Sequence, residues 1–135
     1  MERKEARTLM MKIFYQMDLL NDFDPDREEH YFRDQDLKGQ KNYCRKIYQT
    51  YCDNRDEIDR RIQENSSKWK LSRMPKTDLA ILRVATVEIL FMEKIPDAVA
   101  ANEAVELAKV YGTEESPRFI NAILGSIIRG KTGEA

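Results

Sequence analysis

Apolar residues recur along most of the chain at the three- and four-residue spacing that is typical of amphipathic helices. The first helix is predicted over residues 1–21, with an apolar stripe made of Leu9, Ile13, Met17 and Leu20. Turn-forming residues around Pro25 end it. A second helical run extends from residue 42 to about residue 64, and Asp53 and Asn54 are predicted to divide it into two helices. The pattern therefore favours short helices joined by short connections.

Three later helices are predicted from their first residues. Pro75 precedes a segment, residues 79–92, that is apolar nearly all round and is typical of a helix buried in the middle of a bundle. Pro96 opens the next helix. Ser116 is predicted as the N-cap of the last one, with Pro117 as its first helical residue. Residues 130–135 are expected to fray.

The fold class predicted from this pattern is all-α, with about six or seven helices in a single domain over residues 1–135. A length of 135 residues and a hydrophobic content of 41% suit one domain with its own core. No stretch reaches the roughly 20 apolar residues of a membrane span, and no secretory leader is visible. We therefore expect a cytoplasmic protein. The net charge of −1 excludes a uniformly basic nucleic-acid coat but allows a local basic patch.

The sequence offers no constellation for catalysis. It contains neither of the common glycine-rich phosphate motifs. Its one histidine, His30, stands in an acidic stretch without a nearby nucleophile. We therefore predict no catalytic residues, no cofactor and no metal site.

Two polar residues interrupt apolar helices. Arg83 is expected to form a buried ion pair, with Glu88 or Glu103 as its partner, because an unpaired buried charge is costly. Asn121 lies among apolar residues of the last helix, and its pattern fits either a hydrogen-bonded core position or a ligand contact.

The most informative chemistry lies in the first helix. Arg3, Lys4 and Arg7 occupy its opening turns, where cations oppose the helix dipole, and Tyr15 follows on the side of Lys4. Cations beside an exposed aromatic ring suit single-stranded RNA, because they meet phosphates while the ring stacks on a base. Taken alone, the same pattern also fits a solvated helix end.

Longer stretches carry a family resemblance. Residues 101–124 read ANEAVELAKVYGTEESPRFINAIL, and residues 69–89 read WKLSRMPKTDLAILRVATVEI. Together with RKEAR at the start of the first helix, they resemble the NusB family of bacterial transcription antitermination factors over nearly the whole chain. The resemblance implies two packed helical bundles and an RNA-binding adaptor without catalytic activity. The implied partners are single-stranded boxA-type RNA, the ribosomal protein NusE and the RNA polymerase elongation complex.

The resemblance also implies site residues. One set shares a role in RNA contact: Arg3, Lys4, Arg7, Tyr15, Glu115, Ser116, Arg118 and Phe119. Asp78 is implied in NusE binding. Periodicity alone places Phe119 in the core. Glu5 interrupts the basic arm, here defined as residues 3–7, so weaker RNA binding is expected.

Two other functions remain open at this point. The chain could be a helical protein-interaction module with little RNA binding of its own, which the interrupted basic arm favours. NusB-like domains also precede some ribosomal-RNA cytosine methyltransferases, but no methyl-donor fold is visible here. The sequence is compatible with a monomer or a homodimer.

Overall fold

The computed structural model describes residues 1–131, and all regular secondary structure in that range is helical. Residues 132–135 of the predicted frayed tail lie outside the described residues. Seven α-helices and two short 3-10 helices follow one another as α1 (Arg3–Leu20), η1 (Pro25–Arg27), α2 (Glu28–Phe32), α3 (Lys41–Asp53), α4 (Arg55–Glu64), η2 (Leu71–Arg73), α5 (Lys76–Phe91), α6 (Asp97–Tyr111) and α7 (Ser116–Lys131). The predicted all-α class is confirmed.

Most helix boundaries follow the sequence signals. Asn21 ends α1 in the left-handed conformation, with φ of 50°, and its N–H donates to the carbonyl groups of the last turn. Asn54 separates α3 from α4, as predicted. The expected N-cap of α7 is wrong by one residue: Ser116 is the first residue of the helix, and its hydroxyl accepts the Thr113 N–H at 2.9 Å. The Ser116 hydroxyl therefore stabilises the backbone of the short connection between α6 and α7.

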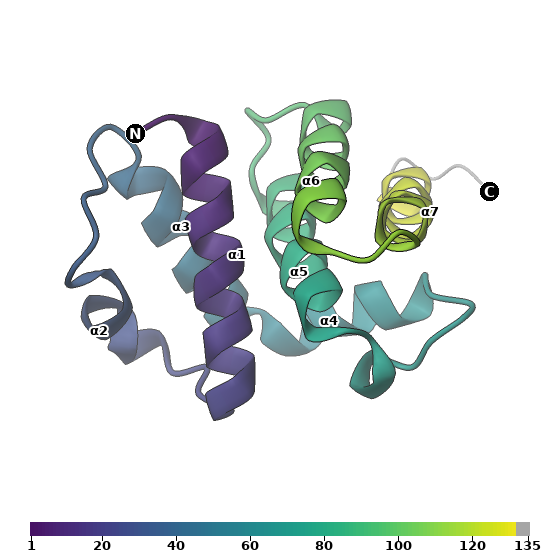
Figure 1. Ribbon diagram of the computed structural model, residues 1–135, viewed down its shortest axis with the longest axis horizontal. Helices are drawn as coiled ribbons and strands as arrows, with labels where there is room; N and C mark the ends of the chain where they lie inside the picture. The colour runs from purple at the N-terminus through teal and green to yellow at the C-terminus, as the bar shows by residue number, and fades with distance from the viewer. Residues whose placement is uncertain (132–135) are drawn as a thin grey trace.

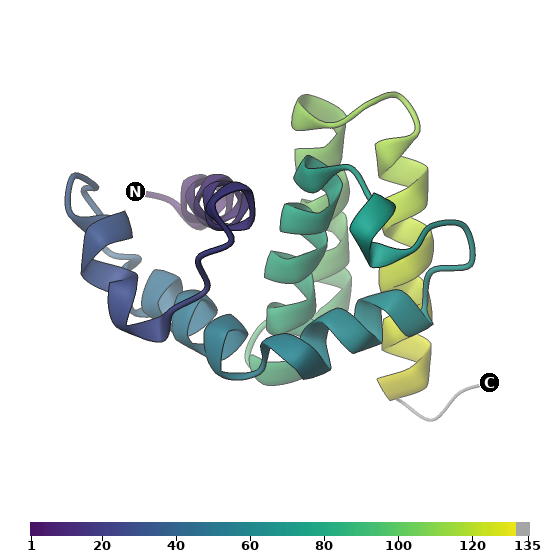
Figure 2. The same ribbon diagram turned by 90° about the horizontal axis from the view of Figure 1, so that it is seen from below.

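Helix α5 is the centre of the molecule. It packs against α1, α3, α4, α6 and α7. Every residue from Asp78 to Ile89 is buried, which is what its nearly unbroken apolar composition predicts. Figure 2 shows α5 standing beside α6 and α7, with α4 running beneath them and α3 beneath α1. The N-terminal and C-terminal helices thus form two packed groups that meet at α5.

The acidic segment between α1 and α3 is tied down by aromatic rings. Tyr31 of α2 is buried, its ring centroid lies 6.1 Å from that of Tyr48, and its hydroxyl donates to Asp22 at 2.9 Å. Phe32 also packs against the Tyr48 ring, edge to face, with the ring centroids 5.7 Å apart. The surrounding carboxylates remain mostly on the surface, so this segment is a short connecting helix held in place by its aromatic residues.

Helices α1 and α6 lie on the same side of α5 (Figure 1). Lys4 near the start of α1 contacts Glu103 of α6, and Lys12 near its middle contacts Tyr111 at the end of α6. Lys4 and Lys12 are eight residues apart on α1, and Glu103 and Tyr111 are eight residues apart on α6. Each spacing corresponds to about 12 Å along a helix. The two helices therefore run in the same direction and create one shared surface, which we call the α1–α6 face.

Candidate nucleic-acid interface

The first turn of α1 is fixed to the rest of the protein rather than projecting from it. The Glu2 N–H donates to the Glu5 side chain at 3.0 Å, so Glu5 satisfies a free donor at the helix start. Arg3 donates through Nε to Gln40 at 2.6 Å, and its guanidinium lies 4.3 Å from the centre of the Tyr43 ring. Glu5 therefore stabilises the helix start in addition to interrupting the basic arm.

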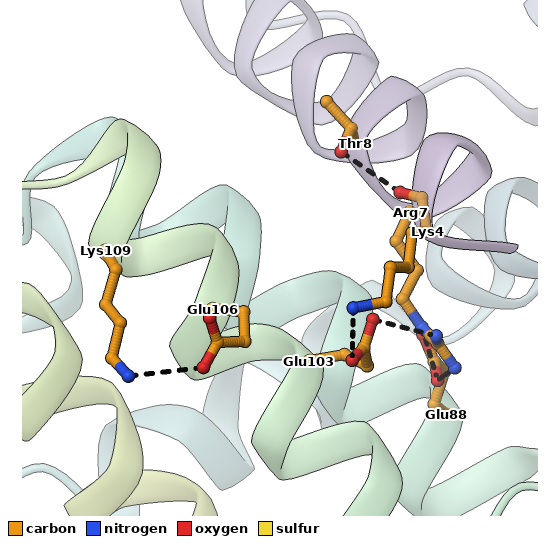
Figure 3. Close-up of polar contacts among 7 residues, drawn as sticks. All are labelled: Lys4, Arg7, Thr8, Glu88, Glu103, Glu106 and Lys109. Carbon is orange, nitrogen blue, oxygen red and sulfur yellow. Dashed lines mark hydrogen bonds and ion pairs between the residues drawn. The ribbon is translucent and has the colours of Figure 1, made fainter.

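Lys4 and Arg7 differ sharply in exposure. The Lys4 side chain is 71% exposed, and its Nζ lies 3.6 Å from Glu103 Oε2. The Arg7 side chain is 7% exposed and forms a bidentate pair with Glu88 of α5. Of the three basic residues predicted to contact RNA, Arg7 is therefore the one whose guanidinium is already occupied inside the protein. Its guanidinium reaches inward, between α1 and α5 (Figure 3).

The Arg7 pair sits in a network of buried polar groups. The Tyr43 hydroxyl donates to Glu88 Oε2 at 2.7 Å, so one carboxylate accepts bonds from α1 and α3 together. Burial by itself lowers the pKa of Arg7, but the hydrogen bonds and charge of Glu88 outweigh it and leave that pKa raised. Burial and the nearby Glu88 carboxylate raise the pKa of Tyr43. The network therefore holds a charged arginine and a neutral tyrosine.

A second group of exposed residues occupies the other end of the α1–α6 face. Tyr15 and Tyr111 are 39% and 41% exposed. Lys12 Nζ lies 5.5 Å from the centre of the Tyr111 ring. These three side chains line a shallow groove of about 190 Å³ together with Met11 and Thr77. Two rings and a cation in one open groove provide what base stacking and phosphate contact require.

Sequence reasoning found Tyr15 but missed Lys12 and Tyr111. Lys12 is three residues before Tyr15 and therefore shares its side of α1. Tyr111 precedes the Gly112 that ends α6, and the periodicity of that helix places it on the inward side, whereas the structure exposes it. The spacing on α1 was a usable signal for Lys12, whereas the meeting of Lys12 with Tyr111 depends on packing.

The start of α7 contributes unevenly to the surface. Arg118 is exposed, and the Glu115 side chain is 81% exposed and lies 3.6 Å from Lys68. Ser116 is 1% exposed, and Phe119 is half-buried against the core. Phe119 therefore follows the periodicity of the helix. Asn121 is exposed, which removes the core alternative for that residue.

Asp78 lies inside the molecule, although it occupies the first turn of α5. It is 4% exposed, and its Oδ1 has no hydrogen-bond partner. Burial raises the pKa of this carboxyl, and a hydrogen bond with Ser116 opposes the rise. Its contact with Ser116 joins α5 to the start of α7, so Asp78 does not itself present a charge to a partner protein.

The expected partners of Arg83 are also wrong. Arg83 forms a bidentate pair with Asp59 of α4, with bonds of 3.0 and 2.9 Å, and a 3.4 Å contact with Asp18 of α1. Residues five apart on a helix point to different sides, so Glu88 faces Arg7 instead. Glu88 and Arg83 therefore join different sides of α5 to its neighbours, Glu88 to α1 and Arg83 to α4 and α1.

Two absences concern the described residues only. Within residues 1–131, no group of three or more metal-binding side chains comes together. In the same range, no helix is long and apolar enough to cross a membrane.

Comparisons with known proteins indicate one family over nearly the whole chain. A family model described as the NusB family matches residues 4–129. The transcription antitermination protein NusB of Alkaliphilus oremlandii is 45% identical over 129 residues, covering 95% of this chain and 94% of that protein. The protein of the same name from Finegoldia magna is 41% identical over 132 residues, with 97% and 96% covered. A solved structure of T. maritima NusB matches with a TM-score of 0.85 and 34% identity, covering 96% of this chain and 92% of that one.

Proposed function

The chain belongs to the NusB family, and we propose that it acts in transcription antitermination as an adaptor that binds single-stranded boxA-type RNA. The observation that carries this proposal is the groove in which exposed Tyr15 and Tyr111 flank Lys12. Rings that accept a stacked base and a cation that meets phosphate are the usual means of binding a single strand. A role on nascent transcripts would place the protein in the cytoplasm.

The proposed RNA surface runs along the α1–α6 face. Lys4 stands at one end and Lys12 and the two tyrosines at the other, and exposed Arg118 in the first turn of α7 is included from the family resemblance. Arg7 takes the role of a positioning residue, because its guanidinium is occupied by Glu88. Arg3 is partly exposed and contributes positive charge to this surface, although its guanidinium also contacts Tyr43 and Gln40.

The small number of exposed cations predicts weak binding by the protein alone. Three phosphate contacts, from Lys4, Lys12 and Arg118, give a slope of about −2.1 in log affinity against log salt, at about −0.7 per contact. Affinity would then fall about twentyfold between about 50 and 200 mM salt. A second subunit on the same RNA would recover affinity, because the two binding events become linked. This supports a non-enzymatic adaptor that works with NusE and the RNA polymerase elongation complex.

We propose that NusE docks near the start of α5 through exposed neighbours of Asp78 rather than through its buried carboxylate. Leu19 and Leu20 at the end of α1 are each 57% exposed. The preceding Asp18 lies 3.3 Å from Lys76 in the first turn of α5. An exposed apolar pair rimmed by charges is suited to a protein contact. Leu20→Arg is expected to weaken NusE binding and to leave the free energy of unfolding nearly unchanged.

A titration tests the RNA proposal. A short boxA-type RNA and a scrambled RNA of equal length are each titrated with the protein, at two salt concentrations, with and without NusE. We expect selective binding that tightens with NusE. Tyr111→Ala is expected to weaken it by about 1–3 kcal/mol, the usual contribution of one stacked base.

Trp69→Ala is the matched control for the tyrosine variant. Trp69 is 37% exposed but lies between α4 and α5, away from the groove. Its removal should leave RNA affinity unchanged. Equal losses in both variants, or no selectivity with NusE present, would favour a protein-interaction module. The internal pairing of Arg3, Lys4 and Arg7 is the observation that supports this second candidate.

A further inference from the structure

Glu103 of α6 points at the basic start of α1. Its Oε2 lies 3.6 Å from Lys4 Nζ, and its Oε1 lies 3.6 Å from Arg7 Nη1 (Figure 3). The Glu103 side chain is 19% exposed, whereas that of Lys4 is 71% exposed. A mostly buried carboxylate thus lies beside the most exposed cation of the basic arm.

Arg7 does not need Glu103 to balance its charge. Its Nε and Nη2 donate to Glu88 over 3.0 and 2.9 Å, and Glu88 is itself held by Tyr43. Glu103 approaches Arg7 and Lys4 equally closely, at 3.6 Å, but Arg7 already has the shorter bonds to Glu88, whereas no other carboxylate is paired with Lys4 among the described residues. Two carboxylates therefore face two cations at this point, and Lys4 has a carboxylate beside it before any ligand arrives.

We propose that Glu103 is an internal competitor of RNA phosphate for Lys4, and that it sets the RNA affinity of the α1–α6 face. A phosphate that approaches Lys4 must displace this carboxylate or accept its repulsion. The inference rests on the proposed RNA-binding function and names a residue that regulates the same surface. It assigns Glu103 a role opposite to that of the cations beside it.

The size of the effect follows from the exposure of the pair. An ion pair with an exposed lysine contributes at most about fivefold to an equilibrium constant. Glu103→Gln should therefore tighten binding to a boxA-type RNA by up to about fivefold at about 50 mM salt. Because Lys4 then gains a full phosphate contact, the salt slope should steepen by up to about 0.7. The advantage of the variant should fall to about twofold at about 200 mM.

Glu106→Gln provides a matched control on the same helix. Glu106 pairs with Lys109 at 3.2 Å, and both side chains are more than half exposed. The control removes the same charge one helical turn away, so a general change in net charge would affect both variants alike (Figure 3). We expect Glu106→Gln to alter RNA affinity by less than about twofold, because Glu106 pairs with Lys109 and not with Lys4.

Lys4→Gln shows whether Glu103 acts through Lys4. In a Lys4→Gln background, Glu103→Gln should no longer tighten binding, because the contested cation is gone. Thermal unfolding of each variant checks that the fold is retained. Tighter binding by Glu103→Gln with equal effect in the Lys4→Gln background would overturn the proposed mechanism.

The outcomes separate this inference from the function on which it rests. Selective RNA binding by the native protein, with equal or weaker binding by Glu103→Gln, would overturn the competitor role and leave the RNA-binding function intact. Failure of both proteins to bind boxA-type RNA, with NusE present, would overturn both. Tighter binding by Glu103→Gln alone, lost in the Lys4→Gln background, would support the inference.

Discussion

Arg7 and Glu88 are 81 residues apart in the sequence and form a buried bidentate pair, with Nη2 to Oε1 at 2.9 Å and Nε to Oε2 at 3.0 Å. The Tyr43 hydroxyl completes the site from α3. One carboxylate on the central helix α5 therefore holds both α1 and α3 in place. The position of the proposed RNA surface depends on this pair, because Lys4 and Lys12 stand on the same helix as Arg7.

Glu88→Gln should destabilise the protein strongly. The amide keeps the shape of the side chain but leaves the buried Arg7 charge without its direct counter-ion. Breaking a buried pair from one side typically costs about 3–5 kcal/mol. Urea unfolding monitored by circular dichroism would measure the loss. Glu106→Gln, which removes a carboxylate from an exposed pair, should change stability by no more than about 0.5 kcal/mol. Similar values for the two variants would contradict the structural role of Glu88.

Two glycine substitutions should have opposite effects. A Cβ at Gly112 would lie 2.5 Å from the Ser116 side chain and 2.9 Å from the Ala108 carbonyl oxygen, and that backbone atom cannot move aside. Gly112→Ala should therefore cost about 1–3 kcal/mol. Gly130, within α7, has open space around its Cβ position, so Gly130→Ala should be neutral or stabilise by up to about 1 kcal/mol. Thermal unfolding of both variants would reveal the difference in sign.

Asp78 should make stability depend on pH. Burial raises the pKa of its carboxyl above the ordinary value of 3.8, against a smaller opposing contribution from the hydrogen bond with Ser116. The folded state therefore binds more protons than the unfolded state between the two pKa values, and stability falls as the pH rises through that window. Asp78→Asn should be more stable than the native protein at pH 7, and the gain should shrink as the pH approaches 4. Denaturant unfolding at several pH values would test this, and a less stable variant at neutral pH would contradict it.

Phe119→Ala and Tyr15→Ala should separate stability from binding. Phe119 is half-buried and packs against the core, so its truncation should lower stability by about 2–4 kcal/mol. Tyr15 is 39% exposed, so Tyr15→Ala should leave stability nearly unchanged while weakening RNA binding by about 1–3 kcal/mol. Unfolding curves and RNA titrations on both proteins would decide the assignment. Native stability in Phe119→Ala would show that the ring serves the surface after all.

Much of the fold was readable from local signals. Pro75 and Pro96 stand just before α5 and α6, and Asn21 ends α1, because these residues have strong backbone preferences that operate within a few positions. The central place of α5 followed from its composition, since a helix that is apolar on all sides must be covered on all sides. The family resemblance, carried by residues 69–89 and 101–124, was confirmed by the comparisons.

The sequence by itself determined which residues share a helix face, because that depends on a fixed angular period. It did not determine which face meets which neighbour. Arg3, Lys4 and Arg7 look equivalent in the sequence, yet packing places one over Tyr43, one on the surface and one inside against Glu88. The tertiary structure alone paired Arg83 with Asp59 and brought Lys12 to Tyr111. Such pairings join helices that are distant in the chain, and only the packing of those helices around α5 brings the side chains within reach.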